Sequence, residues 1–323
     1  TSPYLYFVEM QLRWGMGWLL GLLAFGGFGW AIWQVGRAKI ENQKSKIENL
    51  FLLAWVIPFF LTTGGFFVKF MRYLQPMTPF LMLWAAAWLL SWRSRWLKVG
   101  VGTAVLAITT LYAISFTNMY QQPHPWVAAS QWIFANLPSG SLILSEQWDD
   151  SLPGTMLIDG EVRRRSEYPN AELTWLSGAD LADNEEKLTE NVALLAEADY
   201  VTILSNRIYG VVPRLPERYP LSSQYHALLF AGELGYEPVY VIGRFPTLFG
   251  WQLRPDTFSW SSLQPPTFVQ SYLDKQPGIN LGRADESFIV YDQPLTIVFE
   301  NVERKTAVEL QAFFILPDRH SEP

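Results

Sequence analysis

The chain has 323 residues, half of them hydrophobic, and a slightly positive mean hydropathy, which is too apolar for an ordinary soluble protein. It contains no cysteine, which excludes disulfides, thiol catalysis and cysteine-ligated metals. Residues 1–117 hold ten Lys or Arg and three Glu, a net charge of +7, and since the whole chain carries −6, residues 118–323 carry −13. Two domains in different solvents are indicated, and the acidic one argues against nucleic-acid binding, which needs clustered Lys and Arg.

The first residues, "TSPYLYFVEMQLRWG", contain neither an initiator Met nor a charged region ahead of a short apolar core. This pattern is not typical of a signal peptide. We expect a processed chain, or a fragment whose beginning is missing.

Four segments lack charged residues over at least 19 positions, long enough for a helix to cross a bilayer core of ~30 Å. They cover residues 14–35, 50–68, 74–92 and 99–117. Buried helices of soluble proteins usually keep a polar stripe. The sequence therefore predicts an all-α membrane domain with four transmembrane helices over residues 1–117, followed by an extracytoplasmic α/β domain over residues 118–323.

The loops between these segments predict an orientation. Loops 36–49 and 93–98 hold seven Lys and Arg, and basic loops favour the cytoplasmic side. The 69–73 turn and residues 118–323 are then expected outside. Gly17 with Gly21, and Gly100 with Ala104, have the spacing of close helix packing.

The stretch "KFMRYLQPMTPF" at residues 69–80 joins the second and third segments at the expected outer surface. Prolines are tolerated near a helix start, where backbone N–H groups lack intrahelical partners. Two interpretations of Arg72 stay open. It is an anchor that reaches lipid headgroups, or, with Lys69 and Tyr73, it binds a lipid phosphate, whose oxygens match the guanidinium fork.

The second domain alternates helical and strand patterns. Helices are expected at 125–137, 179–198 and 222–234, strands at 141–146, 199–205 and 236–245, and a hairpin of 287–292 with 295–302 about Gln293–Pro294. This alternation predicts an α/β layer whose sheet is at least partly parallel. Segments 206–220 and 246–282 are rich in proline and are expected to be irregular.

Polar residues directly after the first of these strands form a possible acidic site. Glu146, Asp149 and Asp150 occur in "SEQWDD", where α/β folds often keep functional groups. The cluster has the ligand type for a divalent metal, or for a base; capping of the following turn is the simpler interpretation. The "RRR" at 163–165 is either an anion site or a solvated basic turn, and His124 either carries protons or packs beneath a linker.

Several stretches resemble one enzyme superfamily. "FVKFMRYLQPMTPFLMLWAA" resembles the RYLLPLYP-type stretch of GT-C glycosyltransferases of the protein O-mannosyltransferase and aminoarabinose-transferase kind. "HPWVAASQWIFANLPSGSLILSEQWDDSLP", "NRIYGVVPRLPERYP" and "ESFIVYDQPLTIVF" are similar to later portions of large bacterial membrane proteins of that superfamily. The resemblance implies an enzyme of the bacterial plasma membrane that takes a sugar from a polyprenyl-phosphate carrier at the outer face.

The same resemblance implies roles for residues. Arg72, with Lys69 as a second candidate, would hold the carrier's phosphate. The superfamily's acidic catalytic residue lies in the first outer loop of a longer chain, so the catalytic residue is expected outside this sequence, and Glu9 is a poor substitute for it.

An alternative is a non-catalytic transmembrane subunit of a photosynthetic or respiratory complex, with the outer domain as a docking surface. Its partners would be membrane lipids and other membrane subunits. His124, His226 and His320 all lie outside the apolar segments, so histidine-ligated haem or chlorophyll within them is not expected. A transporter is weaker still, because the apolar segments contain no ionisable residue.

Overall fold

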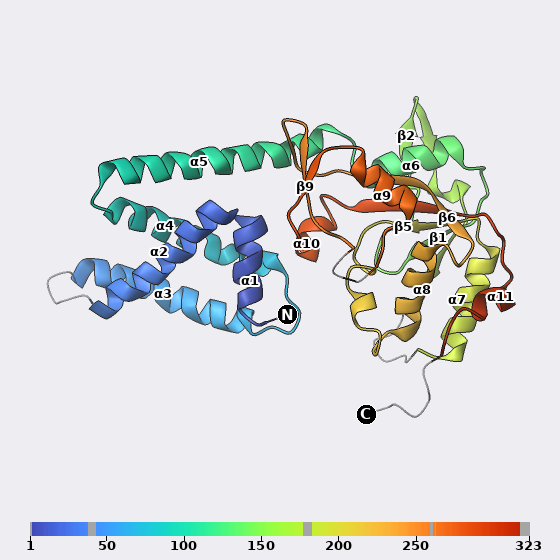
Figure 1. Ribbon diagram of the computed structural model, residues 1–323, viewed down its shortest axis with the longest axis horizontal. Helices are drawn as coiled ribbons and strands as arrows, with labels where there is room; N and C mark the ends of the chain where they lie inside the picture. Colours follow the sequence, from blue (N-terminus) through green and yellow to red (C-terminus); the bar gives the residue numbers. More distant parts are fainter. Residues whose placement is uncertain (1, 38–42, 177–182, 259–260, 262, 317–323) are drawn as a thin grey trace. The chain divides into compact units, whose positions relative to one another are not determined.

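The chain forms two compact units, shown in the computed structural model (Figure 1). The structure describes residues 2–37, 43–176, 183–258, 261 and 263–316. The helical unit consists of Thr1–Thr117 and Ala284–Phe288, and the α/β unit consists of Asn118–Arg283 and Ile289–Pro323. A five-residue segment from late in the chain therefore belongs to the helical unit.

All regular structure that is described in the first 118 residues is helical. These are α1 (Leu5–Met10), the π-helical turn η1 (Gln11–Gly15), α2 (Trp18–Arg37), α3 (Gln43–Gly64), the 3₁₀ helix η3 (Met71–Met77), α4 (Thr78–Ser91) and α5 (Arg95–Asn118). Within the described residues, three stretches are long and apolar enough to cross a membrane: Trp18–Arg37, Ile47–Gly64 and Arg95–Asn136. The last of them contains the whole of α5.

The third expected transmembrane segment is divided between two kinds of helix. The α-helix begins only at Thr78, and its 14 residues extend about 21 Å at 1.5 Å per residue, short of a bilayer core of ~30 Å. Residues before it are 3₁₀, because Pro76 and Pro79 lack the N–H groups that α-helical bonding requires. Because α4 begins only at Thr78, Pro79 falls in its first turn, where a backbone N–H would have no partner within α4 itself. Four spans are therefore not confirmed.

Helices α2 and α4 approach each other closely at Gly27. A Cβ atom there would lie 2.5 Å from the backbone of Trp84, so the approach requires glycine. The glycines singled out in the sequence behave differently. Gly17 has a φ of +75° just before α2 begins. Apart from its own helix and chain neighbours, no described heavy atom lies within 4 Å of the position of a Gly100 Cβ, so Gly100 packs against no other helix of the described residues.

The α/β unit is built on a five-stranded sheet with the order β4-β1-β5-β10-β6. Its strands are β1 (Ile143–Glu146), β4 (Asn170–Leu173), β5 (Tyr200–Ile203), β6 (Tyr236–Gly243) and β10 (Leu295–Asn301). β1 is parallel to β4 and β5, whereas β10 is antiparallel to β5 and β6. The expected mixed α/β region with a partly parallel sheet is confirmed.

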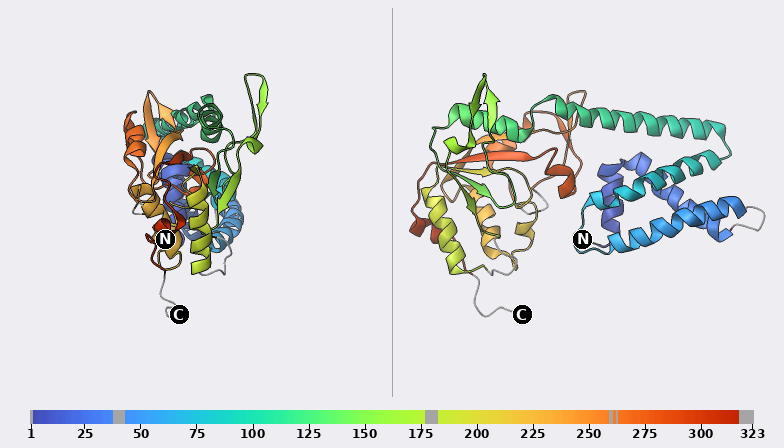
Figure 2. Two further views of the ribbon diagram at one scale, coloured as in Figure 1. Left: turned by 90° about the vertical axis from the view of Figure 1, so that its right-hand side faces the viewer. Right: turned by 180° about the vertical axis from the view of Figure 1, so that it is seen from behind.

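Helices cover both faces of this sheet (Figures 1 and 2). They are α6 (Pro125–Asn136), α7 (Glu185–Glu197) and α8 (Pro220–Ala231). α6 packs with Ile143 on one face, and α7 and α8 pack with Leu144 on the other. Because side chains alternate along a strand, Glu146 points to the same face as Leu144. The end of β1 therefore presents a carboxylate to α8. Residues 179–182, expected to begin the helix that contains α7, lie outside the described residues.

Residues 287–292 are not a strand, so the hairpin expected about Gln293–Pro294 is wrong. Glu286–Ile289 form the short helix α10, and Asp285 precedes it as a cap, since its Oδ1 accepts a hydrogen bond from the Ser287 N–H at 2.7 Å. β10 pairs with β5 and β6 instead.

Short elements complete the α/β unit. They are η4 (Met119–Gln121), the hairpin of β2 (Met156–Ile158) and β3 (Glu161–Arg163), η5 (Arg165–Glu167), η6 (Val212–Arg214), β7 (Thr247–Leu248), β8 (Trp251–Arg254), α9 (Thr267–Asp274), β9 (Gly278–Asn280) and α11 (Ala307–Gln311). β7, β8 and β9 form a second small sheet. The described residues of segment 246–282 thus contain more regular structure than the proline content predicts.

Candidate functional site

A groove in the helical unit is walled by α3 and η3 and encloses about 710 Å³. Its lining is mostly apolar and aromatic: Trp55, Pro58, Phe59, Phe66, Tyr73 and Pro76. Thr62 and Thr63 add two hydroxyls, and Arg72 is the one charged side chain among the described residues that line it. An apolar groove with a single cation suits an amphiphile that has an acyl or prenyl chain and an anionic head.

Arg72 is exposed in the wall of this groove, and no described carboxylate forms an ion pair with it. Its guanidinium carbon lies 4.7 Å from the centroid of the Phe70 ring and 6.0 Å from that of Tyr73. These distances are typical of cation–π contacts, in which the aromatic rings interact with the face of the guanidinium group. Its N–H groups lie in the guanidinium plane and remain free to bind an anion.

The backbone just before Arg72 is held by two buried side chains. Met71 donates its N–H to Asp285 Oδ2 at 2.9 Å and accepts a hydrogen bond on its carbonyl from Gln11 Nε2 at 3.2 Å. Asp285 is 1% exposed and Gln11 is 4% exposed. The hydroxyl of Tyr6 donates to the same carboxylate oxygen. Since both polar backbone atoms of Met71 are satisfied by fixed groups, η3 starts in a defined place and Arg72 has a fixed origin.

The other two residues expected to bind lipid phosphate differ from each other. Tyr73 lines the groove and makes edge-to-face contacts with Phe66 and Phe70. Lys69 does not line it, and its ammonium donates to the Phe67 carbonyl at 3.2 Å. The structure therefore brings Arg72 and Tyr73 together at the groove and leaves Lys69 outside the lining.

Glu146 of the expected acidic site is buried in the α/β unit against a histidine of α8. Glu146 is 2% exposed and His226 is fully buried. His226 Nε2 lies 2.7 Å from Glu146 Oε1, and Nδ1 lies 2.7 Å from the carbonyl oxygen of Ser222. A carbonyl only accepts, so Nδ1 carries hydrogen, and the bond between Nε2 and Oε1 holds one proton shared by an acid and a base.

Unused hydrogen-bonding capacity surrounds this pair. Glu146 Oε2, the Ser222 hydroxyl and the Tyr225 hydroxyl are buried and have no hydrogen-bond partner among the described residues. Burial, with a smaller contribution from the charge of Glu146, raises the pKa of Tyr225 well above its ordinary value, so its hydroxyl stays protonated. Buried polar atoms without partners are uncommon, and here they gather at the end of a parallel strand.

Asp149 and Asp150 do not join the Glu146–His226 pair. Asp149 accepts a hydrogen bond from the Ser205 hydroxyl at 2.9 Å and lies 3.2 Å from an Arg207 guanidinium nitrogen. It thus binds the loop after β5 instead of capping its own turn. Burial raises the pKa of Asp149 to about 6 and outweighs the lowering by Ser205 and Arg207. Asp150 is exposed.

The metal interpretation of this acidic cluster gains no geometric support. Within the described residues, no group of three or more His, Asp or Glu side chains is placed to hold a metal ion. His124 acts as a helix cap, since its Nδ1 accepts from the Trp126 N–H at 3.2 Å and its Nε2 then donates to the Tyr291 carbonyl at 2.8 Å. Both nitrogens are used in packing the start of α6.

His226, Gln11 and Asp285 are the residues of these sites that the sequence reasoning missed. One signal was available for His226, since it lies on a helix without Lys, Arg, Asp or Glu, as Glu146 ends a strand that has no other charged residue. Gln11 and Asp285 carried no such signal. No family model, curated protein or solved structure matches the chain. The resemblance to GT-C glycosyltransferases therefore stays a prediction.

Proposed function

We propose that the helical unit lies in a membrane and that its groove binds a polyprenyl phosphate, so that the chain forms part of a glycosyltransferase that takes a sugar from such a carrier. The observation that carries the proposal is Arg72, a cation without a carboxylate partner among the described residues, in the wall of an apolar groove. A prenyl chain matches the apolar lining, and its phosphate matches the guanidinium.

The surface of the helices supports the membrane part of the proposal. Large apolar side chains on α3, α4 and α5 are strongly exposed, among them Phe51 (78%), Leu90 (67%) and Leu106 (70%). In water such a surface favours aggregation, whereas in a bilayer it is the expected outer surface of a helical protein. Basic loops favour the cytoplasmic side, so we further propose that loops 36–49 and 93–98 both lie there. This orientation requires η3 and α4 together to cross the bilayer, and it leaves the acidic α/β unit outside the cytoplasm.

The proposed chemistry assigns Arg72 a defined role. When the bond between the sugar and the polyprenyl phosphate breaks, negative charge develops on the phosphate, which is the leaving group. A fixed guanidinium stabilises that charge. Tyr73 and the aromatic wall hold the prenyl chain. The acidic base that activates the acceptor is assigned to no residue of this chain.

The test measures binding of polyprenyl phosphate and of the matching polyprenol, which lacks the phosphate, to the full chain in neutral detergent. We expect the wild type to prefer the phosphate, and Arg72→Lys to lose about ten- to a hundredfold of that preference, because one charge-assisted hydrogen bond is worth roughly 1.5–3 kcal/mol. Arg95→Lys, an exposed arginine next to Trp96, is the matched control. Equal binding of both lipids by the wild type, or unchanged preference in Arg72→Lys, would contradict the proposal and favour an anchoring residue in a non-catalytic subunit.

A further inference from the structure

We propose a second anion site, in the α/β unit, in which Arg164 and Arg165 bind a phosphoryl group. The two guanidinium groups line a shallow cavity of about 460 Å³ together with Thr155, Ser166 and Tyr168. Among the described residues no carboxylate lines this cavity, although residues 118–323 carry a net charge of −13. An acidic unit thus presents one concave patch whose charged groups are all positive.

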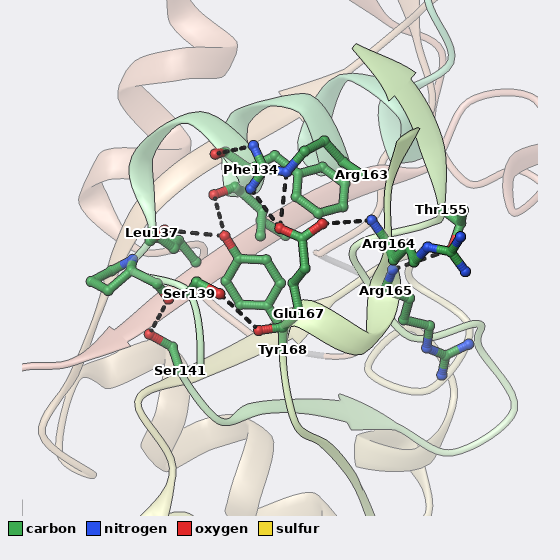
Figure 3. A network of polar contacts seen from close by, with 12 residues as sticks. Phe134, Leu137, Ser139, Ser141, Thr155, Arg163, Arg164, Arg165, Glu167 and Tyr168 are labelled. Carbon is green, nitrogen blue, oxygen red and sulfur yellow. Dashed lines mark hydrogen bonds and ion pairs between the residues drawn. The ribbon is translucent and has the colours of Figure 1, made fainter. Parts of the chain in front are cut away.

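The first arginine of the "RRR" motif is excluded from this site. Arg163 forms an ion pair with Glu167, with nitrogen–oxygen distances of 2.8 and 2.9 Å. Its guanidinium carbon also lies 4.7 Å from the centroid of the Phe134 ring. Figure 3 shows Arg163 turned toward Phe134 and Glu167. Arg163 is therefore a structural residue, and the motif divides into one paired arginine and two arginines without a described carboxylate partner.

The backbone that carries the two free arginines is held in place before any ligand arrives. Glu167 Oε1 accepts from the Arg164 N–H at 2.7 Å, and the Thr155 hydroxyl oxygen accepts from the Arg165 N–H at 3.2 Å. Figure 3 shows both side chains directed away from the Arg163–Glu167 pair. These bonds already fix the turn. Binding an anion therefore costs the conformational entropy of ordering two side chains, without the further cost of ordering a loop.

The donors around the cavity define the class of ligand. Tyr168 is 2% exposed and its hydroxyl already donates within the core, to Ile133 and Leu137 carbonyl oxygens. Thr155 still has its own hydroxyl hydrogen to donate, and Ser166 is exposed. Two guanidinium forks and two hydroxyls require an acceptor with three or four oxygens, which a phosphate monoester has and a single carboxylate lacks.

A phosphoryl group reaches such a site from two sources, as free phosphate or as a lipid headgroup. The experiment therefore uses two probes, inorganic phosphate and the soluble lipid dihexanoyl phosphatidic acid, titrated calorimetrically into the full chain in nanodiscs of neutral lipid. We expect R164Q/R165Q to weaken binding about ten- to a hundredfold, since it removes charge-assisted hydrogen bonds. Similar affinity for both probes identifies the phosphoryl group alone as the ligand, whereas binding of the lipid only identifies a headgroup; both results support the site.

A control separates the site from a general effect of charge. R218Q/K275Q removes the same charge from exposed positions that do not line the cavity, and should bind like the wild type. Equal weakening in both double variants, or unchanged binding in R164Q/R165Q, overturns the proposal. If R164Q/R165Q does not fold, the single variants R164Q and R165Q are measured against R218Q. Arg72→Lys should keep its affinity for inorganic phosphate, so this result does not depend on the proposed prenyl-lipid groove.

Discussion

Asp285 accepts a hydrogen bond from the backbone N–H of Met71, 214 positions earlier in the chain, at 2.9 Å. Met71 directly precedes Arg72, so a carboxylate from the segment 284–288 fixes the start of the turn that carries the proposed phosphate ligand. The same carboxylate caps α10 through Ser287. A buried group that serves two backbone segments at once makes the position of one depend on the other.

This relationship predicts that Asp285 is a positioning residue for lipid phosphate. Asp285→Ala should reduce the preference for polyprenyl phosphate over polyprenol by about tenfold, the equivalent of one hydrogen bond to a charged group, and should leave polyprenol binding unchanged. Ser287→Ala removes another donor to the same carboxylate but keeps the bond to Met71, and should behave like the wild type. Parallel loss of both lipids in Asp285→Ala would indicate general destabilisation instead.

A second prediction concerns the buried Glu146–His226 pair. His226→Ala leaves the Glu146 carboxylate buried without a described hydrogen bond on either oxygen, and should destabilise the α/β unit by about 3–5 kcal/mol. Glu146→Gln should cost much less, because neutral His226 carries its hydrogen on Nδ1 and can accept from the new amide on Nε2. Thermal or denaturant unfolding of the purified full chain checks both, and equal losses would refute the assigned tautomer.

Asp149 predicts a dependence of stability on pH. Because burial raises its pKa to about 6 in the folded state, the folded chain binds this proton more tightly than the unfolded chain. The contribution of Asp149 to the free energy of unfolding is therefore fully present at low pH and is lost as pH rises from about 4 through 6. Asp149→Asn resembles the protonated side chain, so it should be nearly neutral at pH 3 and more stable than the wild type at pH 7.5, by up to about 3 kcal/mol.

The measurement for Asp149 is the difference in unfolding free energy between wild type and variant at the two pH values. Asp150→Asn is the control, since that side chain is exposed and should show no such difference. A variant that is less stable than the wild type at pH 7.5 would show that the ion pair with Arg207 outweighs the cost of burial.

The proposed orientation can be tested by cysteine labelling, since the chain has no cysteine of its own. Ser94→Cys, in the basic loop 93–98, should resist a membrane-impermeant maleimide in intact cells, and Ser139→Cys, exposed in the α/β unit, should react. Both should react after the cells are permeabilised. Labelling of Ser94→Cys in intact cells would reverse the orientation.

The sequence predicted those elements whose pattern is local. Long uncharged runs gave α2, α3 and α5, and alternation of helix and strand patterns gave the mixed sheet of the α/β unit. Pro76 and Pro79 indicated that a helix starts within residues 69–80. The length of the 3₁₀ turn before Thr78 was not predicted, because it depends on the combined effect of the two backbone N–H groups that these prolines lack. Residues 287–292 have a strand-like composition, and their helical start depends on Asp285, whose burial could not be read from its neighbours.

The candidate sites show the same limit more strongly. Arg72 and Tyr73 were found because a motif and two flanking apolar runs mark them. The partners Gln11, Asp285 and His226 lie 60, 214 and 80 positions from the groups they contact, so no local spacing connects them. Division of "RRR" into paired and unpaired arginines likewise depends on Glu167 being folded back on the turn.

Inclusion of residues 284–288 in the helical unit has a consequence for synthesis of the protein. The polypeptide leaves that unit after Thr117, returns to it at Ala284 and leaves again after Phe288. During translation, Met71 is made more than two hundred residues before the carboxylate that receives its N–H. The turn bearing Arg72 therefore reaches its final hydrogen bonding only after the ribosome has passed residue 285, so a chain that stops short of this point carries the arginine without the group that fixes its place.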